Sequence, residues 1–274
     1  MQPTASLYVR TSGPDEAPVI VFLHGGGSSS WMWQPVMDLL PQYRCLAPDL
    51  PEHGQSRAVE PFSMELAAEK VADVIRANGR RATVVGLSEG AQVLVQLLAS
   101  APELVERALI SSALLHPLPG MGFMANPGLI RWMYRLSVTP FQNSDAWIRL
   151  NMKYAAGIPE TYYPQFKQDF QQTSESAFAN LMIANQRFRM PEGLEKAAAP
   201  ALVVVGSKEY RAMKQSARDL AAALPNAKAV QVSLGKAGTL ASEHNWALTA
   251  PLLFAQTVRA WIEDLPLPEA LSPL

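Results

Sequence analysis

Short apolar runs recur along the chain, separated by longer segments in which apolar and polar residues alternate with a helical period. The runs are continuous and rich in β-branched residues, which is typical of strands buried on both faces of a parallel sheet. They occupy residues 19–24, 43–49, 82–88, 107–112, 201–206 and 228–233. Helical patterns are clearest at 64–79, 89–100 and 248–265. The alternation predicts an α/β fold, in which helices flank a mostly parallel sheet.

The alternation breaks off between residues 117 and 191. No strand pattern is present there, and four segments have serine or proline near a helical start: 128–138, 144–158, 159–170 and 174–188. We therefore expect a helical cap at 117–191, inserted between a first part of the core at 1–116 and a second part at 192–274. Six of the chain's eleven methionines fall in this block. Packing of the helices against one another explains most of these methionines, and a subset is expected to face an apolar pocket.

Composition narrows the classes of partner. The 274 residues are 49% hydrophobic, and 23 basic against 24 acidic side chains give a net charge of -1. Such a balance excludes an electrostatic grip on nucleic acid or on anionic lipid, and it favours a small or neutral ligand. The beginning of the chain lacks a signal-peptide pattern, and no apolar stretch reaches the roughly 20 residues that span a bilayer. A cytoplasmic protein is expected, with its oligomeric state open. The single cysteine, Cys45, reads as a buried strand thiol.

Ser88 stands between Gly86 and Gly90 in "VVGLSEGAQ", where a predicted strand meets a predicted helix. A turn of this kind needs small residues on both sides and holds the hydroxyl at the carboxyl end of the sheet. The helix also directs its positive end at the turn, which favours negative charge beside Ser88. The context favours a nucleophile over an ordinary turn serine.

A serine nucleophile needs amide donors and a base. "LHGGG" ends the first strong strand, so the backbone N–H groups of Gly26 and Glu89 are expected to form an oxyanion hole. The side chain of Glu89 has no assigned role and is expected in solvent, where it would favour the helix dipole. Among the four histidines, His244 is the best base, because it follows the last apolar strand run and precedes the final helix. The other three read as loop or boundary residues: His24, His53 and His116.

These motifs together resemble the α/β-hydrolase fold family, and specifically its cap-bearing, esterase-like members. The likeness runs from "VIVFLHGGG" through "APDLPEHGQS" and "VVGLSEGAQ" to "PALVVVGSKE" and "EHNWALTAP". The resemblance implies a sheet of about eight strands, a cap after the sixth, and a chain order of serine, acid and histidine. It also implies that Asp49, His53, Gly54 and Ser56 belong to a structural loop, and that Pro251 stands at the proline position after the histidine.

The resemblance implies Ser88 as nucleophile and His244 as base, but the expected aspartate is replaced. "GSKEY" offers Glu209 at the matching distance from Gly206, and glutamate can orient an imidazole as aspartate does. Two rival readings stay open: Glu209 pairs with a surface cation such as Lys208, or Glu243 serves instead. Glu243 also stands where such families usually have glycine.

The predicted function is hydrolysis of a carboxylic ester of a small to medium, moderately hydrophobic molecule through an acyl-enzyme. The reaction needs no cofactor and no metal. Lactone, thioester and carbon–carbon bond hydrolysis, and metal-free perhydrolysis, use the same residues, so the sequence leaves them open. A receptor-like member of the family, which senses a small ligand in its capped pocket, is the alternative from another class.

Overall fold

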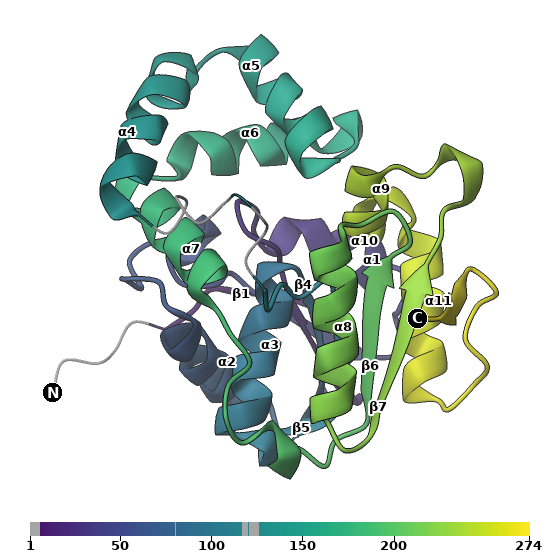
Figure 1. Cartoon of the computed structure of the whole chain (residues 1–274). Coiled ribbons are helices and arrows are strands. Elements are labelled where there is room, and N and C mark those ends of the chain that lie inside the picture. Colours follow the sequence, from purple (N-terminus) through teal and green to yellow (C-terminus); the bar gives the residue numbers. More distant parts are fainter. Residues whose placement is uncertain (1–5, 80, 117–119, 121–125) are drawn as a thin grey trace, which may run out of the picture.

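The computed structural model describes residues 6–79, 81–116, 120 and 126–274, and its central feature is one eight-stranded sheet (Figure 1). The strand order is β1-β3-β2-β4-β5-β6-β7-β8. The strands are β1 Val9–Ser12, β2 Val19–Leu23, β3 Arg44–Pro48, β4 Ala82–Leu87, β5 Val105–Ser111, β6 Ala201–Gly206, β7 Ala227–Val232 and β8 Leu271–Pro273. The six strands predicted from apolar runs are confirmed. They pair in parallel, while β1 and β8 are antiparallel edges.

Helices cover both faces of this sheet. Figure 1 shows α2, α3 and α8 on one face, and α1 and α11 on the other. The core helices are α1 Gln34–Met37, α2 Met64–Asn78, α3 Glu89–Ser100, α8 Arg211–Ala223, α9 Leu240–His244, α10 Trp246–Thr249 and α11 Pro251–Ile262. None of the helices described is long and apolar enough to cross a membrane.

The continuous apolar runs are explained by burial on two sides. In β2, Val21 and Leu23 belong to one hydrophobic cluster, while Ile20 and Phe22 belong to a second cluster on the opposite face. Because successive side chains of a strand point to opposite faces, a strand covered on both sides must be apolar at every position. β1 lacks such a run, because its position at the sheet edge leaves its residues partly exposed.

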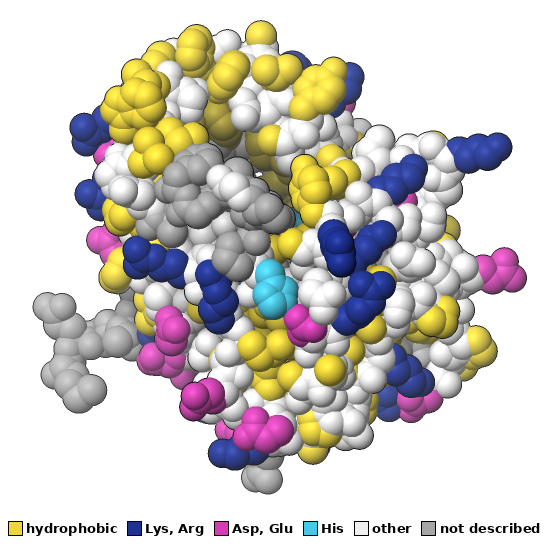
Figure 2. All heavy atoms as spheres, in the orientation of Figure 1, with side chains coloured by type: hydrophobic (Ala, Val, Ile, Leu, Met, Phe, Trp, Pro, Cys, Tyr) yellow, Lys and Arg dark blue, Asp and Glu magenta, His cyan; other side chains and the backbone are white. Residues whose placement is uncertain are grey.

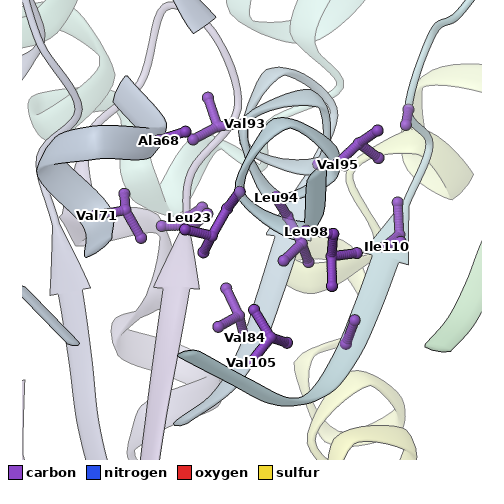
Figure 3. Close-up of a cluster of buried hydrophobic side chains, with 14 of the residues drawn as sticks. Leu23, Ala68, Val71, Val84, Val93, Leu94, Val95, Leu98, Val105 and Ile110 are labelled. Atoms are coloured by element: carbon purple, nitrogen blue, oxygen red, sulfur yellow. The ribbon is translucent and has the colours of Figure 1, made fainter. Parts of the chain in front are cut away.

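Helix α3, which begins directly after Ser88, is the most deeply buried of the long core helices. Figure 3 shows Leu94 and Leu98 of α3 against Val84 of β4 and Ile110 of β5. All of these side chains are fully buried. Burying one such side chain contributes about 1.5–3 kcal/mol, so α3 is held firmly, and the turn before it is fixed in place.

Between β5 and β6, the described residues include four α-helices, which form the insertion together with shorter helical turns: α4 Pro127–Ser137, α5 Asp145–Leu150, α6 Tyr163–Gln172 and α7 Glu175–Arg187. A π-helical turn, η6 Asn151–Ala156, continues α5. The side chains of Ser144 and Ser174 accept hydrogen bonds from backbone N–H groups at the starts of α5 and α7, as the sequence predicted. Residues 117–119 and 121–125 of the predicted cap, with Met121 and Met124, lie outside the described residues.

The insertion follows β5, whereas the resemblance placed it after a sixth strand. The count differs because the eighth strand of the described sheet is the C-terminal β8, and the described chain has a single strand, β1, before β2. Figure 1 shows α4, α5 and α6 beyond one end of the strands, and Figure 2 shows hydrophobic side chains gathered over this part of the surface. In α4, Trp132 and Leu136 are both more than half exposed.

Polar contacts join the insertion to the core. Asp169 of α6 accepts hydrogen bonds from Ser29 Oγ at 2.9 Å and Trp31 Nε1 at 2.6 Å, both in the segment after β2. Asn185 of α7 donates to Gln92 Oε1 of α3 at 3.0 Å. Burial raises the pKa of Asp169 to about 6 despite these donors. The contacts hold the insertion over the turn that carries Ser88.

Candidate active site

Ser88 occupies a sharp turn between β4 and α3. Its backbone angles are φ 56° and ψ -113°, a region that L-residues rarely adopt, and its N–H donates to Ser111 O at 2.8 Å. Within the described residues, its hydroxyl has no hydrogen-bond partner. The hydroxyl is therefore presented to the cavity beside it rather than used to cap the helix.

The two glycines around Ser88 are required by close backbone contacts, as the sequence predicted. A Cβ on Gly86 would lie 2.4 Å from Gly90 O, and a Cβ on Gly90 would lie 2.2 Å from Leu23 O. Both distances are far below van der Waals contact. Any side chain at either position would push α3 away from β2 and β4, and the turn would lose its shape.

His244 ends α9 and forms a close pair with Glu209, which follows β6. His244 Nδ1 lies 2.8 Å from Glu209 Oε1, and the hydroxyl of Ser112 donates to the same oxygen at 2.8 Å. The Glu209 carboxylate is buried, while His244 stays partly exposed toward the cavity. Burial acts to lower the pKa of His244, but the hydrogen bond and the charge of Glu209 outweigh it and raise the pKa above the usual 6.5.

Sequence reasoning missed Ser112. Its signal was position, since it directly follows β5 at the carboxyl end of the sheet, where Ser88 and Glu209 also lie. Like Ser88, it has a positive φ, 59°. Its hydroxyl fixes the oxygen that meets His244, so Ser112 is a positioning residue for Glu209.

The two rival readings of the carboxylate can be compared directly with the geometry. Glu243 is fully buried and accepts hydrogen bonds from Ser207 Oγ at 3.0 Å, Lys208 N at 2.7 Å and Leu234 N at 3.1 Å. Its carboxylate thus ties the loops after β6 and β7 together. The ammonium of Lys208 donates to backbone carbonyls of residues 235 and 238. The structure therefore brings Glu209, and not Glu243, to the imidazole.

The glycine loop after β2 lies beside Ser88, where a Cβ on Gly25 would be 3.6 Å from Ser88 Cβ. The backbone N–H groups of Gly26 and Glu89 donate to no residue that the structure describes. The first N–H groups of a helix lack intrahelical partners, which explains Glu89. Both N–H groups are thus unused within the described residues, and their role as an oxyanion hole stays a prediction.

The side chain of Glu89 contradicts the sequence prediction. It was expected in solvent, but Glu89 is 1% exposed, and neither carboxyl oxygen has a hydrogen-bond partner among the described residues. The prediction failed because the first turn of α3 is covered by other segments: Gly26 follows β2, His53 follows β3, and Leu181 belongs to α7. Burial raises the pKa of Glu89 well above its usual value.

His24 and His53 hold loops, as expected. Leu50 N donates to His24 Nε2 at 2.9 Å, so the ring proton of His24 is on Nδ1, which lies 2.9 Å from Gly25 O. His53 Nδ1 lies 2.8 Å from Pro51 O within its own loop. Asp49 accepts from two backbone N–H groups and joins the segments after β2 and β3.

The remaining motifs lie apart from Ser88. His116 pairs with Asp219 at 2.6 Å on the surface. Cys45 is buried in β3, and burial raises the pKa of its thiol to about 11, so it is held as an unreactive thiol. Across the described ranges, no three His, Cys, Asp or Glu side chains are grouped so that they could hold a metal ion.

Ser88 and His244 both line a cavity of about 640 Å³ between the core and the insertion. Its walls are mostly apolar, and the insertion supplies Phe166, Phe170, Phe178, Leu181 and Met182. A second space of about 220 Å³ adjoins it and also contains Ser88 and His244, together with Glu209 and Ser112. The cavity can hold a small to medium apolar molecule with one end against Ser88.

Curated proteins with similar sequences include named esterases and lactonases. A pimeloyl-[acyl-carrier protein] methyl ester esterase from Nitrosomonas europaea is 37% identical over 107 residues, which cover 39% of this chain and 40% of that protein. The 3-oxoadipate enol-lactonase 1 of Acinetobacter baylyi is 39% identical over 87 residues, 31% of this chain and 33% of that protein. The chain thus spans two fifths or less of these relatives' length.

Solved structures share the fold over almost the whole chain. An enol-lactonase from Burkholderia xenovorans LB400 has a TM-score of 0.72 at 21% identity and covers 94% of this chain and 96% of its own. A thermophilic esterase from Thermogutta terrifontis has a TM-score of 0.73 at 17% identity and covers 94% of this chain and 93% of its own. The model of the alpha/beta hydrolase family matches residues 20–262. The chain therefore belongs to the alpha/beta hydrolase family.

Proposed function

We propose that this protein is a serine hydrolase that cleaves the carboxylic ester of a small to medium, moderately hydrophobic molecule through an acyl-enzyme. The observation that carries the proposal is the contact of His244 Nδ1 with Glu209 Oε1 at 2.8 Å, beside a cavity that Ser88 and His244 both line. A hydroxyl, an imidazole and a buried carboxylate in this order are the parts that nucleophilic acyl transfer needs.

In the first half of the reaction, the Ser88 oxygen attacks the ester carbonyl. The Nδ1–H of His244 donates a hydrogen bond to the Glu209 carboxylate, so the unprotonated Nε2 is left to take the proton of Ser88. A bond forms between Ser88 Oγ and the carbonyl carbon, and the carbonyl π electrons move to oxygen. The backbone N–H groups of Gly26 and Glu89 stabilise that oxyanion.

The oxyanion then collapses, the bond to the alcohol oxygen breaks, and protonated His244 gives its proton to the departing alcohol. In the second half, water attacks the acyl-enzyme while His244 takes one of its protons. The carboxylic acid leaves and Ser88 regains its proton, so the sum is one ester and one water giving one acid and one alcohol.

The apolar walls of the cavity support a substrate with hydrophobic parts. A lactone is a cyclic ester and reacts by the same steps. The similarity to proteins named enol-lactonase makes lactones the second class to test. Thioester, carbon–carbon bond and perhydrolysis substrates belong in the same screen.

The deciding experiment compares Ser88→Ala with the unchanged protein on p-nitrophenyl butyrate. We expect turnover to fall about 10⁴-fold or more, because the attacking oxygen is gone. Ser100→Ala is the matched control, since Ser100 is an exposed serine at the other end of α3. A fluorophosphonate should add one phosphonyl group to the unchanged protein at Ser88 and none to Ser88→Ala, read by mass spectrometry.

Two outcomes would contradict the proposal. Substantial turnover by a folded Ser88→Ala protein would remove Ser88 from the chemistry. A single acyl release followed by no further turnover, together with ligand-dependent binding of a partner protein, would favour the receptor-like alternative instead.

A further inference from the structure

The Glu89 side chain is buried without a hydrogen bond from the described residues, and the polar group nearest to it in the described contacts is His53 Nε2 at 3.8 Å. It is 1% exposed, and within the described residues both carboxyl oxygens lack a hydrogen-bond partner. Buried polar groups are normally paired, and an unpaired one is costly to the fold. By contrast, the equally buried Glu243 accepts hydrogen bonds from side-chain and backbone donors. Glu89 therefore differs both from Glu243 and from Glu209, which has one unpaired oxygen, because neither of its own oxygens is hydrogen-bonded within the described residues.

The carboxyl of Glu89 lies against the glycine loop that borders the cavity beside Ser88. Glu89 directly follows Ser88 and lines the same cavity as Ser88, Gly26 and His244. A Cβ placed on Gly26 would lie 2.6 Å from Glu89 Oε2, so this oxygen lies against the glycine whose N–H we assign to the oxyanion hole. A group on the substrate carbon beside the scissile carbonyl would come within reach of it.

The surroundings of this carboxyl favour its neutral form. His53 Nε2 lies 3.8 Å from Glu89 Oε1, but burial lowers the pKa of His53 to about 3, so the ring brings no positive charge. His24 packs behind His53, and its pKa is lowered by burial too. α7 presents the apolar Leu181 here, and His244 faces the cavity from α9. Burial raises the pKa of Glu89 accordingly.

A neutral carboxyl can both donate and accept a hydrogen bond. A carboxylate in the same place would repel the oxyanion that forms on the neighbouring amides. We propose that Glu89 is a specificity-determining residue that hydrogen-bonds a second oxygen of the substrate, on the carbon next to the scissile carbonyl. The substrate class is then a 2-hydroxy or 2-oxo ester with an apolar remainder. This inference rests on the proposed ester hydrolysis.

The test uses two esters that differ only in that oxygen: ethyl mandelate, which has a 2-hydroxyl, and ethyl phenylacetate, which does not. The readout is the ratio of their kcat/KM values, followed by acid release in a pH-stat. In Glu89→Met, which keeps the size and removes the polar group, we expect the preference for mandelate to fall about tenfold or more. Glu89→Gln keeps a donor and an acceptor and should retain most of it. Comparing ratios cancels the intrinsic reactivity of the two esters and any general loss of activity.

Two further readouts separate recognition from a structural role. In the unchanged protein, the preference for mandelate should decline as the pH is raised and Glu89 ionises, whereas Glu89→Gln should hold its preference constant. The Tm of Glu89→Met should equal or exceed that of the unchanged protein, because an unpaired buried group is removed. A preference that persists within twofold in Glu89→Met would overturn the proposal, as would a lowered Tm with the ratio unchanged.

A binding measurement keeps the inference testable if ester hydrolysis fails. The Ser88→Ala protein is titrated with each ester by calorimetry, which requires no turnover. Tighter binding of ethyl mandelate, lost when Glu89→Met is added, supports the role of Glu89 even if neither ester is hydrolysed. Equal affinity for the two esters overturns it, even if Ser88-dependent hydrolysis is observed.

Discussion

Two contacts between a glutamate and a histidine lie near Ser88, and the pKa of the histidine shifts in opposite directions in the two. In one, Glu209 Oε1 and His244 Nδ1 are 2.8 Å apart, and the pKa of His244 is raised. In the other, Glu89 Oε1 and His53 Nε2 are 3.8 Å apart, and the pKa of His53 is lowered to about 3. The same two residue types therefore give one pair in which the pKa of the histidine is raised and one in which it is lowered.

The difference arises from the donors around each carboxyl. Glu209 Oε1 accepts hydrogen bonds from the Ser112 hydroxyl and from the imidazole N–H of His244. These two donors stabilise a negative charge on the buried carboxylate. The Glu89 carboxyl accepts no hydrogen bond from the described residues, and burial raises its pKa. A buried carboxylate can orient a histidine where neighbouring hydrogen bonds stabilise the negative charge of the carboxylate.

Replacing the two histidines should give the largest difference between the two contacts. We expect His244→Ala to lower kcat by about 10⁴-fold or more, because the proton acceptor for Ser88 is lost. His53→Ala should leave kcat within about tenfold but cost about 2–3 kcal/mol of stability, since His53 packs against His24 and Phe62. Measuring kcat and Tm for both variants decides the matter. A larger kinetic loss at His53 would show that the base has been misassigned.

Replacing the two candidate acids gives the next largest effect. Glu209→Gln should lower kcat by about 10³–10⁴-fold, the scale known for a lost triad acid. Glu243→Gln should change kcat by less than about tenfold but lower Tm, because an amide cannot accept all the hydrogen bonds that this carboxylate receives. If Glu243→Gln were crippled while Glu209→Gln kept its activity, the orienting carboxylate would lie beside the histidine in sequence.

The smallest effects are expected from pH. His244 must be neutral to act as a base, so kcat/KM should rise with pH through a midpoint above 6.5.

The unfolded chain binds a proton at His53 near the ordinary 6.5, whereas the folded protein does so only near 3. Its contribution to stability is therefore fully present above 6.5 and is lost as the pH falls toward 3. His53→Gln should flatten the fall of Tm over this range and leave the kcat/KM midpoint unmoved. A displaced midpoint would contradict the separation of the two pairs.

The sequence by itself determined the sheet and the place of Ser88. Continuous apolar runs identify strands buried on both faces, and Gly86 and Gly90 are small because backbone atoms of neighbouring segments approach them closely. The strand pattern and the small residues around Ser88 can be recognised from short stretches of sequence, although the contact that requires Gly90 comes from Leu23 of β2. The edge strands β1 and β8 were not predicted, because short, partly exposed strands carry no such run.

Only the tertiary structure decided how each glutamate is used. Glu209 and Glu243 both stood as candidates for the orienting acid, and the contacts of their oxygens separated them. Ser112 reaches Glu209 across 97 residues of sequence, and the first turn of α3 is buried by segments that follow β2 and β3 and by α7. Charge state depends on the solvent and the donors around a group, and here segments distant in the chain supply them.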